Sequence, residues 1–138
     1  MSDNTQPPIS KDQGAEKAVL CPFCENKPYF EGRLTKVFFD KYPISEGHML
    51  IVPKRHVSSL WDLEEGEYSE IFETTKEMAK THNFGIDGWN VGVNVGKPAG
   101  QTVMHVHVHL VPRRVGDRED PRGGVRWIIP ERAIYWED

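Results

Sequence analysis

The chain has 138 residues, of which 38% are hydrophobic and 28% are charged, so it is long enough for one domain with an apolar core. Its formal net charge of -4 argues against a protein that binds nucleic acid backbones, because such proteins normally present a basic surface. We therefore expect any anionic ligand to be small and to be held by a few residues.

The N-terminal residues 1–17 carry Ser, Asp, Asn, Gln, Pro and Gly with almost nothing apolar, and they lack the apolar core of a signal peptide. We expect a disordered tail over 1–17, followed by a single domain over 18–138. No stretch approaches the roughly 18 consecutive apolar residues that a membrane helix needs. The sequence predicts a soluble, cytoplasmic protein with neither a membrane nor a nucleic acid as partner.

Two β-rich runs, residues 36–40 and 48–52, flank a connection that contains Pro43 and Gly47. This pattern predicts an antiparallel pair of strands. Between Leu60 and His82, apolar or small side chains recur at every third or fourth position, which predicts the main helix.

Two further strands are predicted in the second half of the chain. Residues 89–95 alternate between apolar and polar or small side chains, and a loop over 96–100 leads into residues 102–111, closed by Pro112. Because hairpin-length connections join the strands, we expect an α+β fold with a mostly antiparallel sheet. Short segments at both ends of the chain are candidates for additional edge strands.

Three of the six histidines, His105, His107 and His109, are spaced two residues apart. On a strand their imidazoles project from one face, while the apolar residues between them face a core. Packing alone explains this pattern poorly, because each buried imidazole needs partners for two ring nitrogens. A group of surface histidines is the plainer alternative.

The histidine pattern admits two kinds of chemistry. A His-x-His pair can place two nitrogens on one zinc ion, but His105 and His109 would lie roughly 13 Å apart on a straight strand, so one ion would not collect all three. An imidazole is also a competent nucleophile toward phosphorus, since a pKa near 6.5 leaves it largely unprotonated at neutral pH. Flanking histidines would then donate to the phosphate oxygens.

The segment 100–111 reads Gly-Gln-Thr-Val-Met-His-Val-His-Val-His-Leu-Val and resembles the signature of the histidine triad family. Residues 38–40 and 47–56 resemble the first hairpin of that family, so the resemblance covers roughly residues 21–114. It implies a histidine-triad-like fold with a mostly antiparallel five-stranded sheet, one main helix and a short second helix. It also implies a homodimer.

By this resemblance, the catalytic residues are the triad histidines, with His107 as the nucleophile that attacks the α-phosphorus and forms a nucleotidyl-histidine. Water then hydrolyses this intermediate, while His109 holds and polarises the phosphate. The other implied nucleotide contacts are Phe38 over the base, Asp40 on the ribose hydroxyls, Asn94 near the ribose or phosphates, and Gly100, Gln101 and Thr102 beside the phosphates or the leaving group.

Two of these positions have plainer interpretations as well. Phe38 lies on an alternating strand, where an aromatic side chain is commonly part of the core. His48 resembles a family histidine close to the triad, and we expect a buried histidine that supports the site.

Cys21 and Cys24 are too few for a disulfide framework, and their C-x-x-C spacing suits a metal knuckle or a redox pair. A redox motif needs a strand before it and a helix after it, and Pro28 follows only four residues downstream. Two free thiols are a further alternative. The resemblance favours zinc, since bacterial triad proteins bind zinc through a set that corresponds here to Cys21, Cys24, His56 and His105.

Such a closed four-ligand zinc site is structural, so catalysis would need no metal. The resemblance then implies hydrolysis of a dinucleoside polyphosphate such as diadenosine tetraphosphate. A histidine at the third triad position, in place of the glutamine of the transferase branch, favours hydrolysis over transfer. Residues 120–126 also resemble a segment of bacterial and archaeal diadenosine tetraphosphate hydrolases.

Several alternatives stay open from the sequence. They are an adenosine phosphoramidate hydrolase, a nucleotidyl transferase or phosphorylase, a non-catalytic nucleotide-binding protein, and a zinc hydrolase with the triad as metal ligands. Trp136 either folds back over a site or packs so that it tethers the chain end. Basic residues that would neutralise a polyphosphate, or merely form solvated surface, are Lys97, Arg113, Arg114, Arg122 and Arg126.

Overall fold

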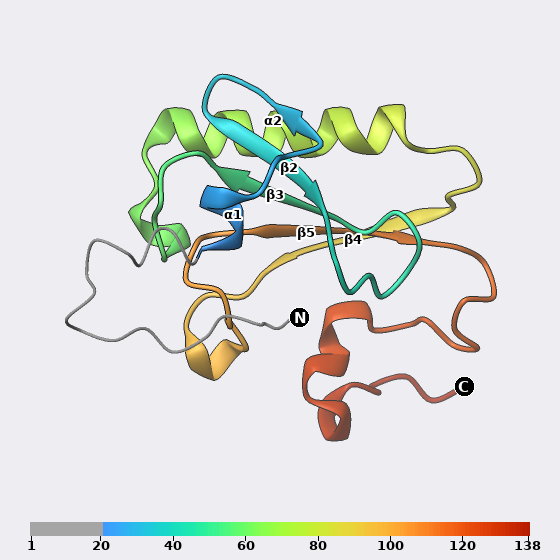
Figure 1. Ribbon diagram of the computed structural model, residues 1–138. Helices are drawn as coiled ribbons and strands as arrows, with labels where there is room; N and C mark the ends of the chain where they lie inside the picture. The colour runs from blue at the N-terminus through green and yellow to red at the C-terminus, as the bar shows by residue number, and fades with distance from the viewer. Residues whose placement is uncertain (1–20) are drawn as a thin grey trace.

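The computed structural model describes residues 21–138, and the expected tail over 1–17 lies outside them. Its centre is a five-stranded antiparallel sheet with one long helix across one face, which confirms the α+β prediction (Figure 1). The strand order is β1-β2-β3-β5-β4. The strands are β1 (Phe30–Glu31), β2 (Thr35–Phe39), β3 (Met49–Pro53), β4 (Gly88–Val93) and β5 (Val108–Arg113).

The long helix, α2, covers Glu65–Thr81 and begins later than the expected start at Leu60. Its first turn is closed by a capping box, in which the Glu64 backbone N–H donates to the Glu67 carboxylate at 2.8 Å. Residues Leu60–Asp62 form a separate 3-10 turn before it. Within residues 21–138, no helix is long and apolar enough to cross a membrane.

The sheet separates two clusters of buried apolar side chains. The larger cluster joins Ile71 and Met78 of α2 to the covered face of the sheet, where Val37, Met49, Ile51, Val106, Val108 and Leu110 lie. The smaller cluster lies on the opposite face and includes the one-turn helix α1 (Pro22–Glu25), the short second helix that we expected. Its buried members are Cys21, Phe23, Phe38, Leu50, Val52 and Val103.

The expected strand over 102–111 is shorter at its start and longer at its end. The Val106 backbone N–H donates to the Val57 carbonyl in a loop, at 2.8 Å, so strand pairing begins only at Val108. Consequently His105 and His107 lie on an extended segment before β5, and of the triad only His109 lies on the strand. Pro112 does not end the strand, because β5 pairs there with β4 alone and its missing N–H costs no hydrogen bond to β3.

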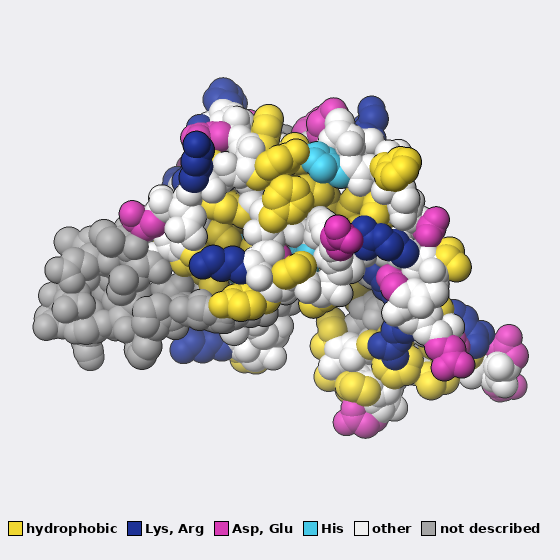
Figure 2. Space-filling view, turned by 45° about the vertical axis from the view of Figure 1, so that its right-hand side comes forward, with side chains coloured by type: hydrophobic (Ala, Val, Ile, Leu, Met, Phe, Trp, Pro, Cys, Tyr) yellow, Lys and Arg dark blue, Asp and Glu magenta, His cyan; other side chains and the backbone are white. Residues whose placement is uncertain are grey.

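The C-terminal segment adds no strand and folds into two 3-10 turns, Gly124–Ile128 and Pro130–Arg132, on the side of the sheet away from α2 (Figure 1). Three arginine–aromatic stacks hold it together, and one of them places Arg122 over Trp136 at 4.6 Å. Trp136 therefore tethers the chain end to its own segment. Figure 2 shows apolar side chains around a histidine at the surface. Among the exposed aromatic residues, Tyr29 packs on Phe39 and on His82.

We predict that Ile71→Ala lowers the free energy of unfolding by about 2–5 kcal/mol, because it opens a cavity between α2 and the sheet. Ile71 is fully buried, whereas the next residue, Phe72, is 45% exposed. Urea unfolding of Ile71→Ala and Phe72→Ala measures the difference. Equal losses in the two variants would contradict this packing of α2.

Candidate active site and metal centre

The triad lies on the sheet face opposite α2, where the segment before β5 passes beside α1 and β3. His105 and His107 are buried, and His109 is half-buried on β5. The rings of His107 and His109 are neighbours, with centroids 5.1 Å apart. A substrate atom beside these two rings could therefore contact both imidazoles.

Hydrogen bonding fixes the tautomer of His107. Its Nδ1 lies 2.9 Å from the carbonyl oxygen of His105, and only a protonated ring nitrogen donates to a carbonyl. Its Nε2 therefore carries the lone pair in the neutral ring, and no hydrogen bond to Nε2 is formed within residues 21–138. This nitrogen has the electronic form that a nucleophile requires.

A second chain of bonds fixes the tautomer of His109. The Ile44 backbone N–H donates to Nδ1 of His48 at 3.2 Å, so Nε2 of His48 carries the proton and donates to Nδ1 of His109 at 3.0 Å. His109 must then be protonated at Nε2. That nitrogen is buried and has no partner among the described residues, so it is an unmet donor.

Burial keeps both rings neutral. It lowers the pKa of His107 below the ordinary 6.5, outweighing the bond to the His105 carbonyl, which raises it. Burial, followed by the nearby His107 and His48, lowers the pKa of His109 to about 4. The lone pair of His107 and the Nε2 proton of His109 are thus both present at neutral pH.

Asp40, His48 and His109 also bring three donor atoms within 4.8 Å of one another. A metal there would need the lone pair of His48 Nε2, which would force a proton onto Nδ1 against the Ile44 N–H. These three residues are better described as a hydrogen-bonded relay, in which the Asp40 carboxylate lies 3.4 Å from His48 Nε2. This bonding argues against a metal ion held by Asp40, His48 and His109.

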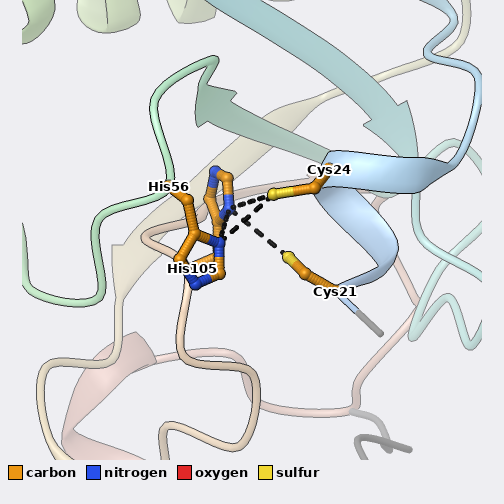
Figure 3. A group of neighbouring side chains, drawn as sticks. All are labelled: Cys21, Cys24, His56 and His105. Atoms are coloured by element: carbon orange, nitrogen blue, oxygen red, sulfur yellow. Dashed lines mark hydrogen bonds between the residues drawn. The ribbon is translucent and has the colours of Figure 1, made fainter. Parts of the chain in front are cut away.

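A different set of donors converges beside the triad, where Cys21, Cys24, His56 and His105 point toward one another (Figure 3). The Nδ1 atoms of the two histidines are 3.1 Å apart, and their distances to the nearer thiol sulfurs are 3.2 and 3.5 Å. Zinc bonds of about 2.0–2.3 Å give a tetrahedron with edges of about 3.3–3.8 Å. The four donors therefore fit one tetrahedral zinc ion.

The hydrogen bonds around these four possible metal ligands also favour a bound cation. Nε2 of His105 lies 2.8 Å from the Pro53 carbonyl, so it donates there and leaves the Nδ1 lone pair directed at the other donors. The loop that carries His56 is fixed by its neighbour Arg55, which makes two hydrogen bonds to the buried carboxylate of Glu67. Burial raises the pKa of Cys21 to about 11, so a thiolate at this position needs a positive partner.

Phe38 and Asp40, the residues expected to contact the base and the ribose, make contacts within the protein. Phe38 is 8% exposed and packs on Phe23, with ring centroids 5.4 Å apart, as a core residue would. The Asp40 carboxylate accepts the Tyr42 backbone N–H at 2.8 Å. Their roles toward a nucleotide stay predictions.

Gln101 is buried, and its amide is fully paired. Its oxygen accepts the Gly96 N–H at 2.9 Å, while its nitrogen donates to the Ser58 and Val103 carbonyls. Gln101 thus fixes the loop that precedes the triad. On that loop, Asn94 is half-buried, Thr102 is exposed, and Gly100 has a positive φ of 98° that favours glycine.

The basic residues expected near a polyphosphate are largely paired elsewhere. Arg113 binds the Asp117 carboxylate, and Arg122 binds Asp120 and the carboxylate of Asp138. Sequence reasoning also missed Phe23, whose ring packs on those of His105 and His107. Its position between two metal-spaced cysteines was the available signal.

Comparisons with known proteins show the family of this chain. The HIT domain family model matches residues 25–116. The bis(5'-nucleosyl)-tetraphosphatase (asymmetrical) of Schizosaccharomyces pombe is 35% identical over 91 residues, which cover 64% of this chain and 50% of that protein. The AP-4-A phosphorylase of Mycobacterium tuberculosis is 32% identical over 126 residues, which cover 80% of this chain and 62% of that protein.

A solved structure, that of a Zn-bound histidine triad family protein from Mycobacterium smegmatis, superposes with a TM-score of 0.68 at 31% identity and covers 75% of this chain and 81% of its own. The chain belongs to the HIT domain family, the family of histidine triad proteins. It spans half to less than two thirds of the two enzymes named above.

The lowered pKa of His107 predicts the pH profile of any reaction in which this ring is the nucleophile. Protonation removes the Nε2 lone pair, and a pKa below 6.5 postpones that loss to more acid pH. We expect kcat/KM to fall toward acid pH with a midpoint below 6.5. An acid limb with its midpoint above 6.5 would contradict the burial of His107.

Proposed function

We propose that this protein hydrolyses a dinucleoside polyphosphate through a covalent nucleotidyl-His107 intermediate. The observation that carries the proposal is the pair of tautomers in the triad, with a lone pair on His107 Nε2 beside an unmet N–H on His109. The first atom is suited to attack phosphorus, and the second is suited to bind a phosphate oxygen.

The reaction runs in two displacements. Nε2 of His107 attacks the α-phosphorus, a P–N bond forms, and the P–O bond to the leaving phosphate breaks with its electron pair staying on that oxygen. Water then attacks the same phosphorus, gives one proton to solvent, and returns the P–N electron pair to Nε2. In both steps the His109 N–H donates to a non-bridging oxygen as charge develops there.

The substrate class rests on the family and on the names of relatives. The S. pombe relative is named a tetraphosphatase of bis(5'-nucleosyl) compounds, and the M. tuberculosis relative is named an AP-4-A phosphorylase. A phosphorylase, in which inorganic phosphate replaces water in the second displacement, is the second candidate function. The observation that favours it is that the match to the M. tuberculosis relative covers 80% of this chain. A homodimer and a cytoplasmic location stay predictions.

We further propose that Cys21, Cys24, His56 and His105 hold one structural zinc ion. The tetrahedral spacing of their donor atoms and the hydrogen bond from His105 to Pro53 support this assignment. When bound, zinc would cross-link α1 to the loop after β3 and to the triad segment. It would not contact the reacting atoms in either displacement.

Quenched reactions with diadenosine tetraphosphate test the covalent mechanism. We expect intact mass spectrometry to detect one added adenylyl group on the wild type and none on His107→Ala. The variant should lose on the order of a thousand-fold or more in kcat/KM. His82→Ala is the matched control, because His82 lies beside Tyr29 and not at the triad, and it should behave as the wild type.

Turnover by His107→Ala at the wild-type rate would disprove the nucleophile assignment. Wild-type protein that binds the nucleotide without an adduct or product would support a binding protein instead. Product analysis with and without inorganic phosphate separates a hydrolase from a phosphorylase.

Metal analysis tests the zinc assignment. We expect one zinc per chain after dialysis of the wild type and little in Cys24→Ala, since three ligands hold structural zinc weakly. A chelator should lower the Tm of the wild type but not that of Cys24→Ala. Equal zinc content in the two proteins would refute this ligand set.

A further inference from the structure

Phe23 connects the metal centre to the triad. It lies between the two cysteines on α1, is 6% exposed, and packs on three other rings. Its ring centroid is 5.3 Å from that of His107 and 5.6 Å from that of His105. Phe38 of β2, at 5.4 Å, backs it from the sheet.

Two kinds of contact hold Phe23 in this place: its packing in the smaller apolar cluster, and the four possible metal ligands around it. The helix α1 has four residues, too few to be stable alone, and its side-chain tie to the sheet is the Lys36 Nζ hydrogen bond to the Phe23 carbonyl at 3.0 Å. The thiols on either side of Phe23 face His56 and His105. Closure of the metal centre would therefore add to this packing in setting the position of the Phe23 ring.

The orientation of the His107 ring needs a packing contact on the side of α1. Its Nδ1 bond to the His105 carbonyl fixes one edge of the ring but leaves it free to tilt about that bond. The Phe23 ring packs against one side of the imidazole and limits this tilt, and His107 is 4% exposed. Attack on phosphorus needs the nitrogen aligned with the bond that breaks, and small misplacements slow such reactions strongly.

We propose that Phe23 is a positioning residue that couples occupancy of the metal centre to the orientation of His107. With the four donors joined, Phe23 holds the imidazole in line; without the metal, α1 and Phe23 move and the nucleophile loses its wall. The Cys-x-x-Cys knuckle thus regulates the rate of attack as well as stabilising the fold. This inference rests on the proposed function, in which His107 is the nucleophile.

The test compares zinc-loaded Phe23→Ala and Phe23→Leu with Phe84→Ala, whose side chain is 99% exposed. We expect Phe23→Ala to keep its zinc, to lose roughly 10–100-fold in kcat, and to change KM less than about threefold, because orientation and not binding is lost. Phe23→Leu should recover part of kcat, because it restores an apolar wall. Phe84→Ala should match the wild type.

A second readout follows His107 without turnover. Diethyl pyrocarbonate modifies accessible imidazoles, and peptide mass spectrometry gives the rate at His107. We expect this rate to rise several-fold in Phe23→Ala and in zinc-free wild type. Zinc removal should raise it much less in Phe23→Ala, because a shared route makes the two changes non-additive.

Wild-type kcat and a wild-type modification rate in Phe23→Ala would overturn the inference, as would a loss confined to KM. If Phe23→Ala does not fold, the same criteria apply to Phe23→Leu. An adenylyl adduct on the wild type with no effect of Phe23 defeats only this inference. Absence of the adduct on the wild type defeats the proposed function instead.

Discussion

The face of the sheet that carries the triad depends on the bonds that His105 makes in three directions. Its Nε2 donates to Pro53 on β3, its Nδ1 faces the cysteine sulfurs and His56, and its backbone carbonyl accepts the Nδ1 proton of His107. The last bond decides which nitrogen of His107 is free to react. Because one residue makes all of these bonds, the cluster of cysteines and histidines, the sheet and His107 share one rigid connection.

The two faces of the sheet carry different kinds of side chain. On one face, α2 buries a continuous apolar layer, which makes β3 and β5 a rigid base. On the other face, a smaller apolar cluster lies beside the histidines and cysteines, and Nε2 of His109 is a buried nitrogen without a partner among the described residues. The relay from Ile44 through His48 to His109 belongs to this second face, and it sets up the N–H that a phosphate oxygen would accept.

The sequence was enough to predict the fold class, the main helix and the convergence of Cys21 and Cys24 with two histidines, because periodicity and the family signature carry this information. It misplaced the strand with the triad, since a loop carbonyl, that of Val57, takes the Val106 N–H in place of a strand neighbour. The sequence did not predict the histidine tautomers, the inward-facing amide of Gln101 or the position of Phe23. They depend on contacts between residues distant in the chain, which spacing does not encode.

The stereochemical course at phosphorus tests the covalent account most directly. The substrate would carry a phosphorothioate of one configuration at the α-position, and the reaction would run in isotopically labelled water. Two in-line displacements, the first by His107, predict net retention of configuration in the nucleoside product. Net inversion would mean that water attacks the substrate directly, and it would contradict the central claim that His107 is the nucleophile.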